Sequence, residues 1–217
     1  MNKNKVEILS HRGYWEKSNE KNTLKSFSKA FKEGFGIETD LRDCDGEIVV
    51  SHDPPIKKED EIFSFKELLD LYKESKSSGF LALNIKSDGI YEEVKYFLNI
   101  YEINNYFTFD MSVPDLMKYL EFNIKTFCRY SEFENPLYLK DKVNGLWLDS
   151  FSQSNFDDLK LNEFIKTWDS IAIVSPELHG LDNKRIWSQL KKFKDRGRNI
   201  KLFLCTDKPA EARSYFN

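Results

Sequence analysis

Short apolar runs alternate along the chain with segments in which hydrophobic residues recur at helical spacing. The runs are too short for helices and are typical of strands buried in a parallel sheet. We predict core strands at 6–9, 36–40, 81–86, 106–110, 125–129, 145–149, 171–174 and 201–205. A further strand, 48–51, is predicted after the Asp45-Gly46 turn, where it forms a hairpin with the strand before it.

Helices are predicted in most of the intervals between these strands. Asn22-Thr23 is a typical helix start, Gly34 a typical helix end, and Pro114 suits a first helical turn. The predicted helical segments are 23–33, 64–73, 91–101, one beginning near 114, 162–168, 184–196 and 209–216. Only 131–143 shows no clear pattern.

Eight core strands separated mostly by helices predict an α/β fold, namely a closed parallel (β/α)8 TIM barrel. At 217 residues the chain lies at the compact end of the roughly 200 to 400 residues usual for that fold. The alternative is an open doubly wound sheet, but no Gly-x-Gly-x-x-Gly follows any predicted strand. Because no linker or low-complexity stretch divides the chain, we predict one domain over residues 1–217.

Composition and charge exclude several classes of protein. A hydrophobic content of 40% is enough for one core, and a net charge of −3 argues against a nucleic-acid-binding protein or a polybasic membrane anchor. No apolar run approaches the ~20 residues of a membrane span, and residues 1–5 are too polar to open a signal peptide. The three cysteines are far apart and lack metal-ligand spacing, which suggests a reducing compartment. We therefore expect a cytoplasmic protein without a stable membrane anchor, of undetermined oligomeric state.

Polar residues at the predicted strand ends suggest where chemistry takes place, because (β/α)8 barrels carry their active sites at the carboxyl ends of the strands. Glu38 and Asp40 lie on one face of their strand and His52 follows the next, a pattern that suits a divalent metal beside an acid–base group. Taken alone, this stretch also fits an exposed acidic strand with a capping histidine. All three histidines fall at or just beyond predicted strand ends, which favours the catalytic interpretation. The other polar residues at such ends are Arg12, Asn84, Lys86, Asp110, Arg129, Asp149 and Glu177.

The loop 175–180 is a second candidate element. It carries Glu177 and His179 directly after the most apolar predicted strand. The loops of a barrel determine which substrate is bound. We therefore interpret Glu177 and His179 either as residues that contact the substrate or as residues that support such contacts. Arg12 and Lys86, also at predicted strand ends, are each consistent with a surface charge when taken singly.

Several separately placed motifs resemble those of one family, the glycerophosphodiester phosphodiesterases, whose fold is a phospholipase-C-like phosphodiesterase barrel. In chain order they are Ser10-His11-Arg12-Gly13, Asn22-Thr23 with Phe27 and Ala30, Gly34, Glu38-Thr39-Asp40, and Asp45-Gly46 running into Val50-Ser51-His52-Asp53. The resemblance implies a metal-dependent phosphodiesterase. It implies that His11 and His52 serve as acid and base, that Glu38 and Asp40 bind the metal, and that Arg12 and Lys86 contact phosphate. Mg²⁺ or Ca²⁺ is the expected cofactor, because both prefer oxygen ligands.

Two positions depart from the family pattern. Asn84 stands where the family usually has a third acidic metal ligand, and Lys21 stands where a glutamate is common. We predict hydrolysis of a small phosphodiester, such as a glycerophosphodiester, with no nucleic-acid partner. Two alternatives stay open. One is a lyase that releases a cyclic phosphate. The other is a non-catalytic phosphodiester-binding barrel, which is consistent with Asn84 in place of a third acidic metal ligand.

Overall fold

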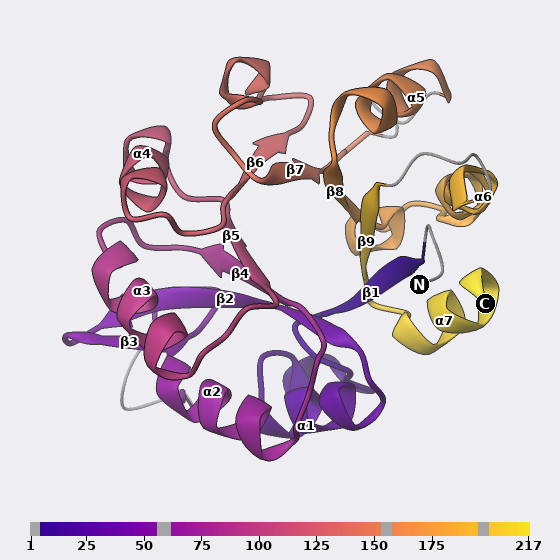
Figure 1. Cartoon of the computed structure of the whole chain (residues 1–217). Helices are drawn as coiled ribbons and strands as arrows, with labels where there is room; N and C mark the ends of the chain where they lie inside the picture. The colour runs from indigo at the N-terminus through magenta and orange to yellow at the C-terminus, as the bar shows by residue number, and fades with distance from the viewer. Residues whose placement is uncertain (1–4, 56–61, 153–157, 195–199) are drawn as a thin grey trace. The chain divides into compact units, whose positions relative to one another are not determined.

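The computed structural model describes residues 5–55, 62–152, 158–194 and 200–217. Strands and helices alternate along the chain (Figure 1). The strands are β1 (Val6–His11), β2 (Gly36–Cys44), β3 (Glu47–Val50), β4 (Leu81–Ile85), β5 (Tyr106–Phe109), β6 (Phe127–Tyr130), β7 (Gly145–Leu148), β8 (Ser170–Val174) and β9 (Lys201–Thr206). The α-helices are α1 (Leu24–Lys32), α2 (Phe65–Glu74), α3 (Tyr91–Ile100), α4 (Val113–Glu121), α5 (Asp158–Thr167), α6 (Lys184–Lys194) and α7 (Pro209–Phe216). Short 3-10 turns are η1 (Ser18–Glu20), η2 (Leu137–Leu139) and η4 (Pro176–His179).

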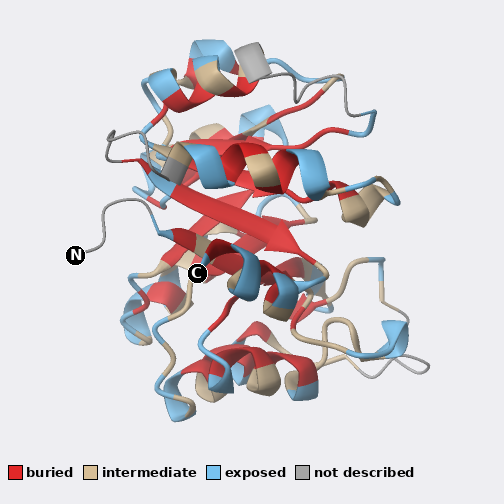
Figure 2. Cartoon of the chain, turned by 90° about the vertical axis from the view of Figure 1, so that its right-hand side faces the viewer, coloured by how far each residue is buried: buried red, intermediate tan, exposed pale blue. Residues whose placement is uncertain are grey.

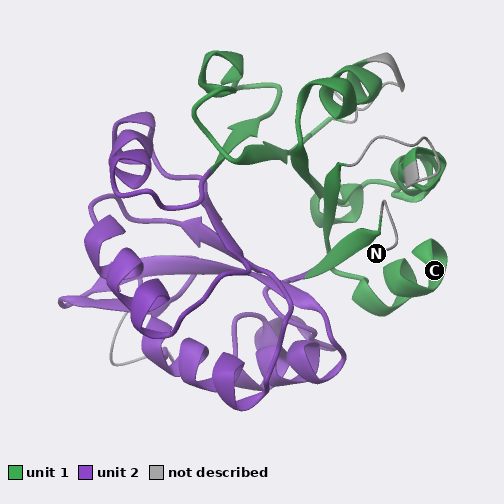
Figure 3. Cartoon of the chain, viewed as in Figure 1, with its two compact units in different colours: residues 1–9, 127–217 green, residues 10–126 purple. Residues whose placement is uncertain are grey.

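The chain divides into two compact units, which Figure 3 colours separately. Unit 2 comprises Ser10–Thr126. In it β2 pairs in parallel with β4, β4 pairs in parallel with β5, and β3 returns antiparallel along β2. The register places Asp40 opposite Asn84, so the polar ends of these two strands lie side by side.

Unit 1 comprises residues 1–9 and Phe127–Asn217. Here β6, β7, β8 and β9 pair in parallel in chain order. The core strand β8 is buried from Ile171 to Val174, as the continuous apolar run predicts. Strand β1 is shared, since its first four residues belong to unit 1 and its last two to unit 2.

The helices form where the sequence provides caps and one apolar face. Thr23 caps α1 by accepting a hydrogen bond from Ser26 N at 3.2 Å, and Ser64 caps α2 in the same way from Glu67 N. Figure 2 shows buried residues along the strands and along one side of the helices, with exposed residues on the other side. None of the helices in the described ranges is long and apolar enough to cross a membrane.

The eight predicted core strands and the hairpin strand are all present in the described chain, with ends shifted by one or two residues except in β2. Strand β2 continues to Cys44, further than predicted, because β3 pairs with its second half. Helix α5 begins at Asp158, earlier than predicted, and 131–143 contains only the short turn η2. The predicted end of the helix before β9 falls on 195–199, outside the described residues. One domain over residues 1–217 stays a prediction.

Candidate functional site

The candidate site of unit 2 is built on β2, on the residues that precede the part paired with β3. Glu38 and Asp40 alternate along this strand and therefore project from the same face, where both are almost fully buried. Asn84, at the neighbouring position of β4, donates a hydrogen bond from Nδ2 to Glu38 Oε1 at 3.3 Å. The predicted metal residues Glu38, Asp40 and Asn84 are thus brought together, as their places in the sheet require.

The end of β1 brings His11 to this cluster, and the tight turn that follows brings Arg12. Arg12 adopts a left-handed backbone (φ +56°) and its N–H donates to the Glu38 carbonyl at 2.9 Å. Gly13 follows at φ +91°, and a Cβ there would lie 2.3 Å from Ser26 Oγ. Only glycine fits at this position, so the Arg12-Gly13 pair of the motif has a direct structural role in presenting the site.

Asp40 is held by charged and polar neighbours. Arg12 Nε lies 3.2 Å from Asp40 Oδ2 but does not direct its N–H at that oxygen, so the contact is an ion pair rather than a hydrogen bond. Asn22 Nδ2 donates to the same oxygen at 2.9 Å, while Asn22 Oδ1 accepts from Thr39 Oγ1 at 3.0 Å. The sequence marked Asn22 as part of a helix start and of a family motif, without a contact to Asp40. Its left-handed backbone (φ +54°) turns the side chain toward Asp40 instead.

Lys86 lies between two carboxylates. Its Nζ is 3.7 Å from Asp40 Oδ1 and donates to Asp110 Oδ2 at 3.3 Å. Asp110, at the end of β5, has a left-handed backbone (φ +75°), which is uncommon outside glycine and concentrates at functional sites. Asp110 thus holds the lysine beside the cluster, a partnership that the sequence did not indicate.

The charges of this cluster are not fully balanced. Burial and, to a lesser degree, the neighbouring Asp40 carboxylate together raise the pKa of Glu38 to about 8, although Arg12 and Lys86 act to lower it. Two cations therefore do not offset the cost of burying two carboxyl groups so close together.

Three buried oxygens of this cluster have no hydrogen-bond partner: Glu38 Oε2, Asp40 Oδ1 and Asn84 Oδ1. Buried polar atoms are normally satisfied, so a set of unsatisfied oxygens on two paired strands is a suitable cradle for a hard cation. Within the described ranges, no group of three or more His, Cys, Asp or Glu side chains is arranged to hold a metal ion. The cluster has two carboxylates, and its third oxygen comes from an amide.

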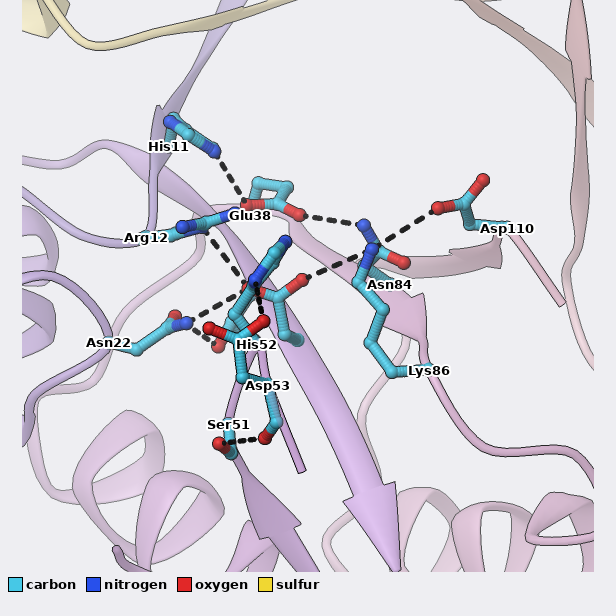
Figure 4. Close-up of polar contacts among 12 residues, drawn as sticks. His11, Arg12, Asn22, Glu38, Ser51, His52, Asp53, Asn84, Lys86 and Asp110 are labelled. Carbon is cyan, nitrogen blue, oxygen red and sulfur yellow. Dashed lines mark hydrogen bonds and ion pairs between the residues drawn. The ribbon is translucent and has the colours of Figure 1, made fainter. Parts of the chain in front are cut away.

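Figure 4 shows the two predicted catalytic histidines, His11 in contact with Glu38 and His52 in contact with Asp53. His11 Nε2 is 3.9 Å from Glu38 Oε2, and its side chain is 15% exposed. His52 follows β3 with a side chain 42% exposed, and its Nδ1 lies 2.9 Å from Asp53 Oδ1. An imidazole held at Nδ1 by a carboxylate presents Nε2 for proton transfer.

Glu177 and His179 belong to unit 1. Both Glu177 oxygens accept hydrogen bonds, one from the Ser175 hydroxyl and one from the Thr206 hydroxyl. His179 Nε2 lies 2.7 Å from Asp149 Oδ1, and the Phe151 ring packs against the imidazole with centroids 4.6 Å apart. These contacts tie the η4 loop to the ends of β7 and β9. A substrate contact for either residue stays a prediction.

Comparison with models of protein families supports the resemblance seen in the sequence motifs. Residues 11–61 match the model of the glycerophosphoryl diester phosphodiesterase family. This span contains His11, Arg12, Glu38, Asp40 and His52. No curated protein matches the chain significantly.

Solved structures extend the similarity over the whole chain. A glycerophosphodiester phosphodiesterase from Parabacteroides distasonis ATCC 8503 is 17% identical with a TM-score of 0.72, covering 99% of this chain and 98% of that one. A phosphodiesterase from Oleispira antarctica, in complex with the product sn-glycerol-3-phosphate, is 16% identical with a TM-score of 0.66 over 96% of each chain. A glycerophosphodiester phosphodiesterase from Agrobacterium tumefaciens str. C58 is 14% identical with a TM-score of 0.67, covering 98% of this chain and 99% of that one. The chain therefore has the (β/α)8 barrel fold predicted from its sequence.

Proposed function

We propose that this chain, which resembles the glycerophosphodiester phosphodiesterases in its N-terminal motifs and its fold, is itself a metal-dependent phosphoric diester hydrolase. The observation that carries the proposal is the buried cluster on β2 and β4. Glu38, Asp40 and Asn84 offer unsatisfied oxygens there, with His11, Arg12 and Lys86 beside the two carboxylates, and His52 follows the paired strand β3. Fold similarity alone does not give function, so the proposal depends on these side chains.

The residues present fit a divalent hard cation. Glu38 and Asp40 would hold it through carboxylate oxygens and Asn84 through its amide oxygen, since Mg²⁺ and Ca²⁺ both prefer such ligands. When bound, the ion supplies Lewis-acid stabilisation of the charge that develops on a phosphoryl oxygen.

Arg12 and Lys86 are the proposed phosphate ligands. A phosphodiester gains negative charge as its phosphorus is attacked, so cations already held beside the site stabilise the transition state. The ion pair with Asp40 holds Arg12, and the hydrogen bond to Asp110 holds Lys86. Both side chains are therefore preorganised before the substrate binds.

His11 and His52 are the proposed acid and base. One imidazole takes a proton from the attacking water or hydroxyl, and the other gives a proton to the leaving alkoxide. Asp53 orients His52 through Nδ1, while His11 lies beside Glu38. Protons thus enter and leave at two separate nitrogens near one phosphoryl position.

The proposed substrate is a small glycerophosphodiester. The Oleispira antarctica phosphodiesterase of the same fold holds the product sn-glycerol-3-phosphate, which is compatible with a substrate of this class here. We propose, as the sequence predicts, that His179 contacts the substrate. Since both Glu177 oxygens are engaged by hydroxyl groups, Glu177 is better suited to holding the loop that carries His179.

We expect the purified chain with Mg²⁺ or Ca²⁺ to convert a glycerophosphodiester to a phosphomonoester and an alcohol. Phosphorus NMR distinguishes the three functions under consideration. A monoester signal supports the hydrolase, accumulation of a cyclic phosphate indicates the lyase, and unchanged diester with measurable binding indicates a non-catalytic barrel. The Asn84 amide keeps the last alternative open, because it contributes one charge fewer than a carboxylate.

Replacing Asn84 by glutamate should tighten metal binding. The added carboxylate faces the cation across a short distance, and after desolvation is subtracted we expect the metal concentration for half-maximal activity to fall about tenfold. Calorimetry measures the same change without activity. Asn99→Glu, on the exposed side of α3, is the matched control, because it adds the same charge away from the cluster. If Asn84→Glu leaves metal affinity at the Asn99→Glu value, Asn84 does not bind the ion.

A further inference from the structure

Arg42 joins the two strand ends that border β2. It lies two residues beyond Asp40 on β2 and pairs in register with Val49 of β3. Its Nε donates to the His52 carbonyl at 3.0 Å, and its Nη1 donates to the Lys86 carbonyl at 3.2 Å. One guanidinium thus bridges the segment after β3 and the segment after β4.

We propose that Arg42 is a positioning residue that sets the distance between the His52 imidazole and the Lys86 ammonium. The inference rests on the proposed function, in which His52 transfers a proton and Lys86 contacts phosphate. Arg42 itself touches neither the cluster oxygens nor, in this proposal, the substrate. It acts through the backbone of the two residues that do.

The His52 segment needs such support. The His52 side chain is 42% exposed, so packing constrains it weakly. Its neighbours provide two further contacts: Ser51 N donates to the Asp40 carbonyl at 3.1 Å, and Ser51 Oγ donates to the Asp53 carbonyl at 2.6 Å. Both hold the segment to β2 or to itself, whereas Arg42 also ties it to the Lys86 segment.

The chemistry of arginine suits this role. A guanidinium presents several N–H donors in one rigid plane, so two acceptors bound to it are held at a fixed separation. A lysine at the same position has a single flexible ammonium and cannot impose that separation. Since a displacement of about 1 Å costs on the order of 10²-fold in rate, the bridge is expected to matter for turnover.

A purely structural role predicts something different. If Arg42 only satisfied two carbonyls, its loss would lower stability and leave the activity of the folded enzyme unchanged. Positioning predicts a loss of turnover in a folded protein and a changed environment of His52. The two roles are therefore separable.

The kinetic test compares Arg42→Met and Arg42→Lys with Arg185→Met, an exposed arginine of α6. We expect Arg42→Met to lower kcat about 10²-fold with less than about threefold change in KM, and Arg185→Met to leave both unchanged. The kcat of Arg42→Lys should be no more than about threefold above that of Arg42→Met, because lysine restores the charge without the planar guanidinium. In a His52→Ala background, Arg42→Met should cost clearly less, since the part of its effect that passes through His52 is already lost and only the part through Lys86 remains. An equal cost in both backgrounds would overturn the inference.

The second test needs no activity. The chain has only three histidines, so imidazole nitrogen–proton NMR spectra can be assigned with single histidine variants. In folded Arg42→Met we expect the His52 imidazole resonances to shift and those of His179 to stay as in the wild type. An unchanged His52 would overturn the inference even if the wild type hydrolyses diesters. A changed His52 in a protein that hydrolyses none would refute the proposed function and leave the positioning role of Arg42 intact.

Discussion

Replacing His11 or His52 by alanine is expected to lower turnover at least ~10²-fold, because each removes one of the two proposed proton transfers. Neither side chain belongs to the apolar core: His52 is 42% exposed and His11 ends β1 beside Glu38. The variants should therefore fold, which circular dichroism and thermal unfolding would check. The loss should appear in kcat more than in KM, since proton transfer is completed in the transition state.

His179→Ala is the matched control for these two variants. His179 contacts Asp149 and Phe151 of unit 1 and has no proposed part in proton transfer. We expect it to raise KM with kcat reduced less than about tenfold. A kcat loss for His179→Ala as large as that for His11→Ala, with unchanged KM, would show that the acid–base pair is assigned wrongly.

Removing divalent metal is expected to abolish diester hydrolysis, and adding Mg²⁺ or Ca²⁺ back should restore it. The reason is the set of unsatisfied oxygens on Glu38, Asp40 and Asn84, which one bound cation can satisfy together. Metal content by elemental analysis and binding by calorimetry provide measurements that are independent of turnover. Full activity after exhaustive chelation, in protein free of metal, would refute the metal dependence.

Charge-neutral variants connect this metal dependence to particular side chains. Glu38→Gln keeps the shape of the side chain but removes its charge, and we expect it to weaken metal binding about tenfold or more. Glu92→Gln on the exposed face of α3 is the matched control and should change neither metal binding nor activity. Equal metal affinity in the two variants would exclude Glu38 as a ligand.

Much of the architecture could be predicted from local patterns. The apolar runs of β1 and β8 and the caps Thr23 and Ser64 act within a few residues, so sequence alone indicates the elements that they form. The same holds for Glu38 and Asp40, because alternation along a strand determines that both side chains leave on one face. The resemblance in residues 11–61 then connected this pattern with a chemistry.

Other parts of the site depend on the tertiary structure. Nothing in the sequence indicated that Asn22 would bind Asp40, that Asp110 would hold Lys86, or that Arg42 would bridge two strand ends. Asn22 and Asp110 have left-handed backbones, which sequence patterns do not predict outside glycine-rich turns. Their partners lie 18 and 24 positions away along the chain.

The sequence by itself determined the alternation of strands and helices, the face on which Glu38 and Asp40 lie, and the placing of the three histidines at or just beyond strand ends. These features follow from short-range periodicity and capping, which act along the chain. The tertiary structure alone decided which cationic side chains and which side-chain amides contact those carboxylates. Such pairings depend on strand register and loop closure, because both bring residues together that are distant in sequence. Asp40 lies beside Asn84 because β2 and β4 pair in parallel in that register. No local signal in the sequence indicates this register.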